Sequence, residues 1–413
     1  MFHPGPAPMA AALLIVMLLC ASPAPAFYED DDISMRASIR ALAVAMENPD
    51  IPLLYKNRND TVAGAMGRME LKAAWGGWAA LELNAYALGY HNSGQGGAAG
   101  IVKLQAAERS VALERGLWEN SHSKGEVALD WGNITFTYDW LDLKIGRQPV
   151  NLSSALYFTP NDFFAPFAAD VFYRVYKAGV DAVRLEAGLG PLTQLTLLAV
   201  AGYDADPDSV NGFKAAPAQD RTSYVSRLST VAMDYEFVVV GGQVRRWNVR
   251  GGSFQGTFFD WLGVRIEGHQ AEPLDKGGKT RLEWTVELEH RFISSLDLRV
   301  ALFHHGGGAD KVDRYAEYLL TADSQSPYLA RWYAAAGASY EFTPLLTGQA
   351  LGLMNLVDDS MTLSLNLVYS LSDEGEFFAG ISIPTGKKPE GFTIRSENGA
   401  RPITASMEAR YYF

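Results

Sequence analysis

Cysteine is almost absent from this sequence. Its 413 residues contain a single one, Cys20, which lies in an apolar stretch near the N-terminus. One cysteine cannot form an internal disulfide or a cysteine metal site, and removal of a leader containing Cys20 would also exclude a thiol nucleophile. This scarcity is unusual for a soluble secreted enzyme of this size and common among barrels that pass through an oxidising periplasm.

Long apolar runs are also missing, apart from residues 10–19. That run is shorter than the ~20 apolar residues of a transmembrane helix. It precedes Ala24-Pro25-Ala26, small residues of the kind that a signal peptidase reads. Although no lysine or arginine precedes the run, the sequence predicts a signal peptide at residues 1–26, cleaved before Phe27. We expect residues 27–413 to form one domain.

Apolar residues are nevertheless plentiful, at 48% of the chain. The mean hydropathy is only −0.04, so they are interleaved with polar residues. Only helices and closed barrels satisfy every backbone group inside a bilayer, and an interleaved composition suits a barrel with one lipid face and one wet face. The formal net charge of −12 argues against a nucleic-acid partner.

A period of two is the main pattern along the chain, as in β-strands with two different faces. It is clearest between residues 279 and 292, where most even positions are apolar. The odd positions there are polar or charged: Lys279, Arg281, Glu283, Thr285, Glu287, Glu289 and Arg291. The last strand behaves in the same way, with Ala409, Tyr411 and Phe413 on one face.

Strand-like segments are joined by alternating long and very short connections, as in membrane barrels. We therefore predict an all-β fold, a transmembrane antiparallel up-and-down β-barrel of about 16–18 strands. A soluble β-sandwich or propeller is the alternative, but several segments reach the ~9–11 residues needed to cross a bilayer at a tilt. Residues 91–124 are predicted to be an outer loop with a short helix, and residues 311–320 a helical turn or two.

The polar face of the predicted strands supplies a set of candidate pore-lining residues. Charged groups are tolerated there only when water or an opposite charge meets them. Acids and bases nearly balance, so they can orient polar solutes, pair across strands to hold the wall together, or do both. The set is Arg36, Arg40, Arg68, Glu70, Lys72, Glu82, Asp142, Lys144, Arg184, Glu186, Arg265, Glu267, Arg281, Glu283, Glu287, Glu289 and Arg299.

The loop at residues 151–176 is the best candidate for a constriction. It is rich in phenylalanine, and these rings could pack against the inner wall. Its charged residues, with one just beyond it, would then face the opening: Asp162, Asp170, Arg174 and Lys177. The alternative is an apolar outer loop that touches a neighbouring protein or lipopolysaccharide.

Two parts of the chain resemble Gram-negative outer-membrane porins of the substrate type. Tyr411 and Phe413 resemble the terminal signal that the barrel assembly machinery reads. Gly146-Arg147-Gln148, Pro160-Asn161-Asp162 and Lys177-Ala178-Gly179-Val180-Asp181 resemble a block in which one strand leads into an inward loop. The resemblance implies a channel in the outer membrane. By strict alternation Arg147 and Asp181 fall on the lipid-facing side of adjacent strands, and we expect them to pair near the outer rim.

Motifs for catalysis or for cofactors are not evident: we find no phosphate loop, metal-spaced histidine pair or nucleophile elbow. A metal site at His304 and His305, beside Gly306-Gly307-Gly308, is one interpretation, but two adjacent residues of a strand point to opposite faces. We therefore expect loop histidines in solvent. We therefore predict a non-enzymatic protein without cofactors, a porin for passive diffusion of small polar or charged solutes. The alternative is a barrel that sheathes another protein, such as a multihaem cytochrome.

The expected partners follow from this reading. They are outer-membrane lipid, lipopolysaccharide and the barrel assembly machinery, with a homo-oligomer or a periplasmic or extracellular protein as further candidates.

Overall fold

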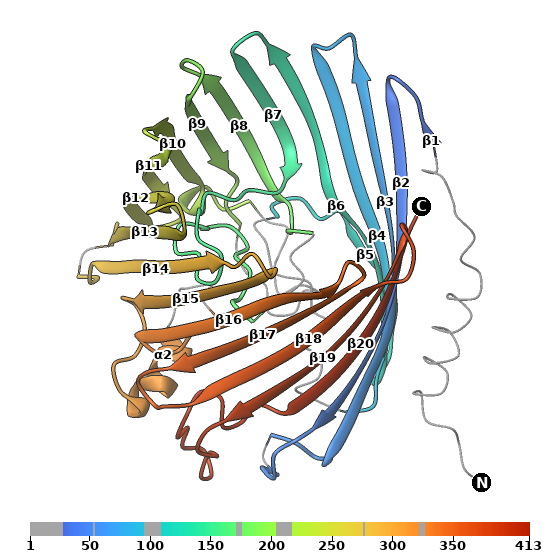
Figure 1. The fold of residues 1–413 in the computed structure, drawn as a ribbon, viewed down its shortest axis with the longest axis vertical. Helices are drawn as coiled ribbons and strands as arrows, with labels where there is room; N and C mark the ends of the chain where they lie inside the picture. Colours follow the sequence, from blue (N-terminus) through green and yellow to red (C-terminus); the bar gives the residue numbers. More distant parts are fainter. Residues whose placement is uncertain are drawn as a thin grey trace.

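The computed structural model describes residues 28–52, 54–94, 109–170, 176–203, 217–275, 277–321 and 327–413. The predicted signal peptide lies outside these residues. The strands form one antiparallel sheet that closes on itself, because β2 pairs with both β3 and β20 and Ala41 lies opposite Ala409. Figure 1 shows the resulting barrel.

Eighteen strands make the wall, so the predicted fold class and strand number are confirmed. Their bounds are β2 (Ile33–Glu47), β3 (Asn59–Trp75), β4 (Ala79–Asn92), β6 (Ser123–Tyr138), β7 (Leu141–Gln148), β8 (Val180–Gly188), β9 (Thr193–Val200), β10 (Ser223–Ala232), β11 (Tyr235–Val244), β12 (Trp247–Phe258), β13 (Leu262–Pro273), β14 (Arg281–Arg291), β15 (Leu296–His305), β16 (Trp332–Thr343), β17 (Leu346–Asn355), β18 (Met361–Ser370), β19 (Gly375–Thr385) and β20 (Ile403–Tyr412).

Two further strands lie outside this count. β1 (Tyr28–Glu29) pairs with the start of β2, and β5 (Glu114–Glu119) pairs with β6. β5 belongs to the connection at residues 91–124, for which a short helix was predicted. Residues 114–119 of this connection are extended, and residues 95–108 lie outside the described ranges. The indole of Trp118 on β5 lies so close to β6 that a Cβ at Gly125 would be 2.4 Å from it.

Short turns join the strands at one end of the barrel, and most long connections lie at the other. Met233 and Asp234, between β10 and β11, have φ values of 54° and 65°. Two successive positive values are typical of the type I′ turn, whose twist matches that of the strands it joins. The helical turn predicted at residues 311–320 is confirmed by η3 (Val312–Arg314) and α2 (Tyr315–Thr321). Among the described residues no helix is long and apolar enough to span a membrane.

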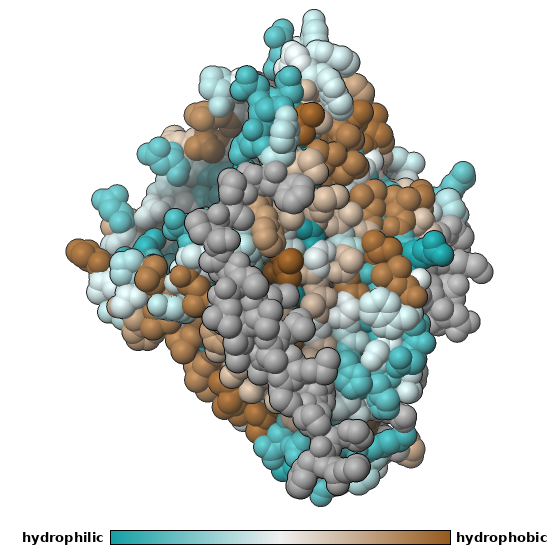
Figure 2. Space-filling view, turned by 90° about the vertical axis from the view of Figure 1, so that its right-hand side faces the viewer, coloured by the Kyte–Doolittle hydropathy of each residue, from teal (hydrophilic) through white to brown (hydrophobic). Residues whose placement is uncertain are grey.

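The two faces of the wall differ as the alternation predicts. On β14, Leu282 and Leu288 are exposed on the outer face, whereas Glu287 points inward and is buried. Large exposed apolar side chains recur on many strands from β2 to β20, and Figure 2 shows patches of hydrophobic residues on the outer surface. The apolar clusters of the core lie inside the barrel, between the wall and a loop that enters it.

Candidate functional site

The connection between β7 and β8, of which residues 149–170 and 176–179 are described, enters the barrel instead of standing above it (Figure 1). Phe163 and Phe164 pack in a buried cluster with inward-facing residues of β8 to β13, such as Val240. Phe158 stacks on Phe303 of β15, with ring centroids 4.8 Å apart. The phenylalanines therefore hold this inward loop against the inner wall, as expected if the loop folds inward.

Two wall carboxylates anchor the inward loop. Glu267 accepts hydrogen bonds from the Ser153 hydroxyl at 2.6 Å and from the backbone N–H groups of Ser154, Ala155 and Asn161 at 2.6, 2.9 and 3.2 Å. Glu287 accepts from two further N–H groups, of residues 156 and 157, at 2.9 and 2.6 Å. Both carboxylates point inward, as the alternation predicts, but the loop covers them.

The loop crosses the barrel to its opposite side. The Tyr157 hydroxyl lies over β16, where a Cβ at Gly337 would be 1.8 Å from its oxygen. The Ala169 N–H donates to the Tyr328 hydroxyl at 2.8 Å. Asp170 pairs at 3.3 Å with Arg401, in the connection before β20. The loop is therefore fixed at both sides of the barrel, and it divides the interior.

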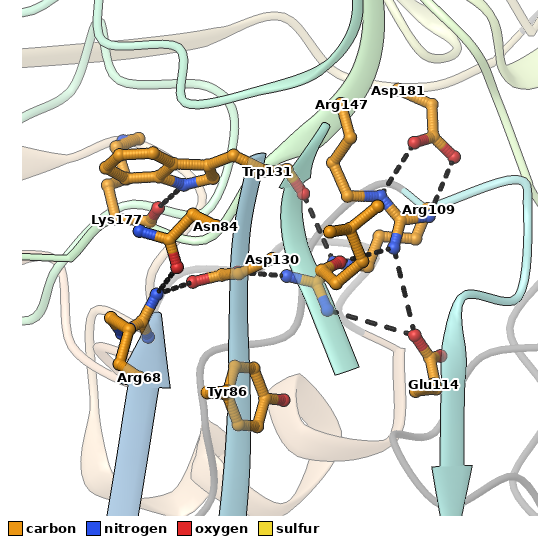
Figure 3. A network of polar contacts seen from close by, with 12 residues as sticks. Arg68, Asn84, Tyr86, Arg109, Glu114, Asp130, Trp131, Arg147, Lys177 and Asp181 are labelled. Carbon is orange, nitrogen blue, oxygen red and sulfur yellow. Dashed lines mark hydrogen bonds and ion pairs between the residues drawn. The ribbon is translucent and has the colours of Figure 1, made fainter. Parts of the chain in front are cut away.

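The end of the loop, residues 176–179, returns to the wall through a buried polar network (Figure 3). Asp130 lies at a β-bulge of β6 and pairs with Arg68 of β3 at 2.9 Å and with Arg109. The Arg68 guanidinium also lies 4.0 Å from the centre of the Tyr176 ring. Burial raises the pKa of Tyr176, and the nearby Glu70 carboxylate raises it further. The Trp131 indole donates to the carbonyl oxygen of Lys177 at 2.8 Å.

Arg147 and Asp181 form the predicted pair, with Arg147 Nε 2.8 Å from Asp181 Oδ1. The predicted lipid-facing environment is wrong, since only 1% of the Arg147 side chain is exposed. The segment before β5 covers it: Val111 donates its N–H to Asp181 at 3.0 Å, and its carbonyl oxygen accepts from Arg147. Alternation within two strands cannot show that a distant segment of the chain covers them.

Most of the other predicted pore-lining charges form ion pairs on the inner face, which we call the charge belt. Glu289 is held between Arg265 at 2.6 Å and Arg299 at 2.5 Å, and its side chain is 24% exposed. The other pairs are Lys72 and Lys144 with Glu82, Arg184 with Glu186, and Arg40 with Glu408. Arg36 approaches Glu29 at 3.9 Å, Glu70 accepts from Asn84 at 3.1 Å, and Asp142 lies opposite Glu186.

The predicted constriction residues are dispersed by the loop's path. Asp162 and Lys177 form a buried ion pair with each other, and Asp170 bonds Arg401. Arg174 lies outside the described residues. Arg281 and Glu283 lie at the end of β14, beside a hollow above the loop. Among the described residues no group of three potential metal ligands comes together.

Several charged residues of the site were not among the predicted ones. Asp130 was missed because the bulge breaks the strict alternation. Arg109 and Glu114 belong to a connection without a periodic signal. His305 was expected in solvent, but this is wrong: it is fully buried at the end of β15, where Tyr318 of α2 covers it. At the C-terminus, the Phe413 N–H donates to the Ala37 carbonyl oxygen at 2.8 Å, and the rings of Tyr411 and Phe413 are 4.9 Å apart.

Comparisons with known proteins agree with this architecture at the level of the fold. No family model matches the sequence, and no curated protein matches it. Among solved structures, the chain is similar to OccAB3 of Acinetobacter baumannii, with a TM-score of 0.60 at 11% identity over 93% of this chain and 100% of that one.

Two other solved structures show the same likeness. A BenF-like porin from Pseudomonas fluorescens Pf-5 has a TM-score of 0.59 at 9% identity, covering 93% of this chain and 99% of that one. OccD3 (OpdP) of Pseudomonas aeruginosa has a TM-score of 0.56 at 10% identity, covering 94% and 93%. Together with the closed wall of 18 strands, these likenesses show that the chain has the fold of Gram-negative outer-membrane porins.

Proposed function

We propose that this chain forms a channel in the outer membrane through which small polar or charged solutes diffuse passively. The observation that carries the proposal is the charge belt on the inner face. Its ion pairs are only partly buried, as the 24% exposure of Glu289 illustrates. Partly exposed charges inside a barrel require water, and a barrel of 16–18 strands is typically wide enough to hold an aqueous channel.

The inward loop supplies the narrow part of this channel. Its anchors on Glu267 and Glu287 hold it across the interior, so solutes pass between the loop and the remaining wall. A hollow of about 250 Å³ beside Tyr157, Asp297 and Arg299 lies along this wall. Charges of both signs line the inner face, and we therefore expect weak selectivity between small anions and cations.

The same loop argues against the sheath as the alternative function. A protein occupant such as a cytochrome would need the space that the loop fills, and moving the loop would leave Glu267 without the four hydrogen bonds it accepts from it. Porins are not enzymes, and we assign no catalytic role to the chain. Lipid, lipopolysaccharide and the barrel assembly machinery remain its proposed partners.

Planar bilayer recordings with the purified protein test the proposal. We expect steady single-channel current, with a reversal potential near zero in a gradient of potassium chloride. Swelling of liposomes that contain the protein, in a panel of sugars, amino acids and organic anions, then identifies the solutes that pass. A folded protein that is silent in bilayers and impermeable in liposomes would refute the channel function.

A further inference from the structure

A hollow of about 140 Å³ lies on the side of the inward loop that faces the long connections. Phe163, Pro166 and Phe167 of the loop form one side of it, and Trp247 and Phe303 of the wall form another. An apolar cavity of about 150 Å³ holds a benzene-sized molecule. The aromatic part of the lining and the size suit an apolar side chain, while the rest of the lining is polar and includes Asp162, Arg245 and His269.

A cationic group faces this hollow. The guanidinium of Arg281 lies 4.2 Å from the centre of the Trp247 ring, which holds it by a cation–π contact. Within the described part of the chain, no hydrogen-bond acceptor or carboxylate lies within bonding distance of Arg281. Arg281 also lines the hollow, and its planar set of N–H donors can bind a carboxylate there in bidentate fashion.

An anionic group lies beside it. Glu283 is two residues further along β14, on the same face, so the two side chains start about 6.7 Å apart. His305 Nδ1 donates to Glu283 at 2.9 Å, and its Nε2 lies 2.9 Å from the Tyr318 hydroxyl. These two contacts fix the imidazole ring, which orients the Glu283 carboxylate beside the hollow that it lines.

We propose that this hollow binds a small zwitterion with an apolar side chain, that is, an α-amino acid of about the size of phenylalanine. Arg281 would receive its carboxylate and Glu283 its ammonium group, while the aromatic lining receives the side chain. A simple anion would meet the charge of Glu283, and a simple cation that of Arg281. The inference rests on the proposed channel, in which the hollow would be a binding site on the path of the solute.

The test uses the purified full-length protein in detergent micelles and saturation-transfer NMR with L-phenylalanine as the probe. Three analogues each remove one feature: the methyl ester lacks the carboxylate charge, the N-acetyl derivative lacks the ammonium group, and glycine lacks the side chain. We expect phenylalanine to bind at least about tenfold more tightly than each analogue. The methyl ester and the N-acetyl derivative each lose a hydrogen bond between charged groups, and glycine loses the apolar side chain that the aromatic lining would bury.

Substitutions assign the two charges. Arg281→Gln should weaken the binding of phenylalanine about tenfold and leave the binding of the methyl ester unchanged. Glu283→Gln should also weaken the binding of phenylalanine about tenfold, and it should leave the binding of the N-acetyl derivative unchanged. Arg291→Gln, at the opposite end of β14, and Glu341→Gln, its partner at 3.5 Å, are matched controls that should change nothing.

Equal binding of phenylalanine and either charged analogue by the unmodified protein would overturn the assignment, as would the absence of saturable binding. Because NMR detects binding without conduction, this failure is distinct from that of the channel. A protein that conducts but does not bind phenylalanine refutes only the site, whereas one that binds but does not conduct refutes the channel.

Discussion

The buried pair of Arg147 and Asp181 makes a quantitative prediction about the wall beside β7. Replacing Asp181 by asparagine removes the charge that compensates a guanidinium with 1% exposure. Breaking a buried pair by removing one partner typically costs 3–5 kcal/mol of unfolding free energy, in round terms. Glu114 still lies 3.9 Å from Arg147, and the asparagine oxygen can still accept from Val111. We therefore expect Asp181→Asn to lower the free energy of unfolding by about 3 kcal/mol, at the lower end of that range.

The measurement is a urea titration of protein refolded in lipid vesicles, followed by tryptophan fluorescence. Asp181→Asn, Arg147→Gln and the double variant form a cycle, in which we expect a coupling energy of about 1.5–3 kcal/mol. Arg36→Gln is the control, because Arg36 and its partner Glu29 are 63% and 58% exposed and such a pair contributes at most about 1 kcal/mol.

Exchanging the two charges should rescue only part of this loss. Arg147 also donates to the carbonyl oxygens of Leu129 and Val111, and an aspartate in its place cannot donate. A coupling energy near zero, or a loss below about 0.5 kcal/mol for Asp181→Asn, would show that the pair does not hold the wall.

Three further predictions concern the loops. Glu267→Ala removes the acceptor of four loop hydrogen bonds, which should cost about 1–3 kcal/mol of the free energy that holds the loop in place. Single-channel conductance should therefore rise and fluctuate more, and unchanged recordings would exclude an anchoring role for Glu267. Gly337→Ala places a methyl group against the Tyr157 hydroxyl, at a cost of about 1–3 kcal/mol, and should alter conductance; adding Tyr157→Phe should restore it in part. Burial raises the pKa of Glu397, between β19 and β20, above its usual 4.5, so its contribution to stability is greatest below that pH and is lost as pH rises through the raised pKa. Protection factors for hydrogen exchange in residues 386–402, which correct each rate for the intrinsic pH dependence of amide exchange, should therefore be higher at about pH 4 than at pH 7, and Glu397→Gln should remove the difference.

Particular residues show how far sequence reasoning reached in the site. The phenylalanines at 158, 163 and 164 indicated an inward loop, because buried aromatic rings need a surface to pack against, and that path is observed. The alternation on β14 predicted that Glu283 and Glu287 share the inner face, and Glu287 accepts hydrogen bonds from the inward loop while Glu283 lines a hollow beside it. Their surroundings could not be predicted: the loop covers Glu287, while Glu283 faces a hollow.

Local pattern failed where distant segments meet. The bulge at Asp130 changes the face on which its side chain lies, and no motif marks it. His305 looked like a solvent-exposed loop residue, but α2 folds over it and supplies the Tyr318 hydroxyl as its partner. Arg147 was placed on the outer face, and the segment before β5 covers it. For His305 and Arg147 the covering residues lie in long connections, whose path does not follow from strand periodicity.

The sequence by itself determined the barrel: its alternation of apolar and polar residues leaves one face for lipid and one for water, and closure then satisfies every backbone group of the wall. The tertiary structure alone decided which inward charges remain accessible to water, which anchor the inward loop, and which are covered by β5 and its flanks. The reason is physical, since alternation is a property of neighbouring residues, whereas exposure depends on segments far away in the chain.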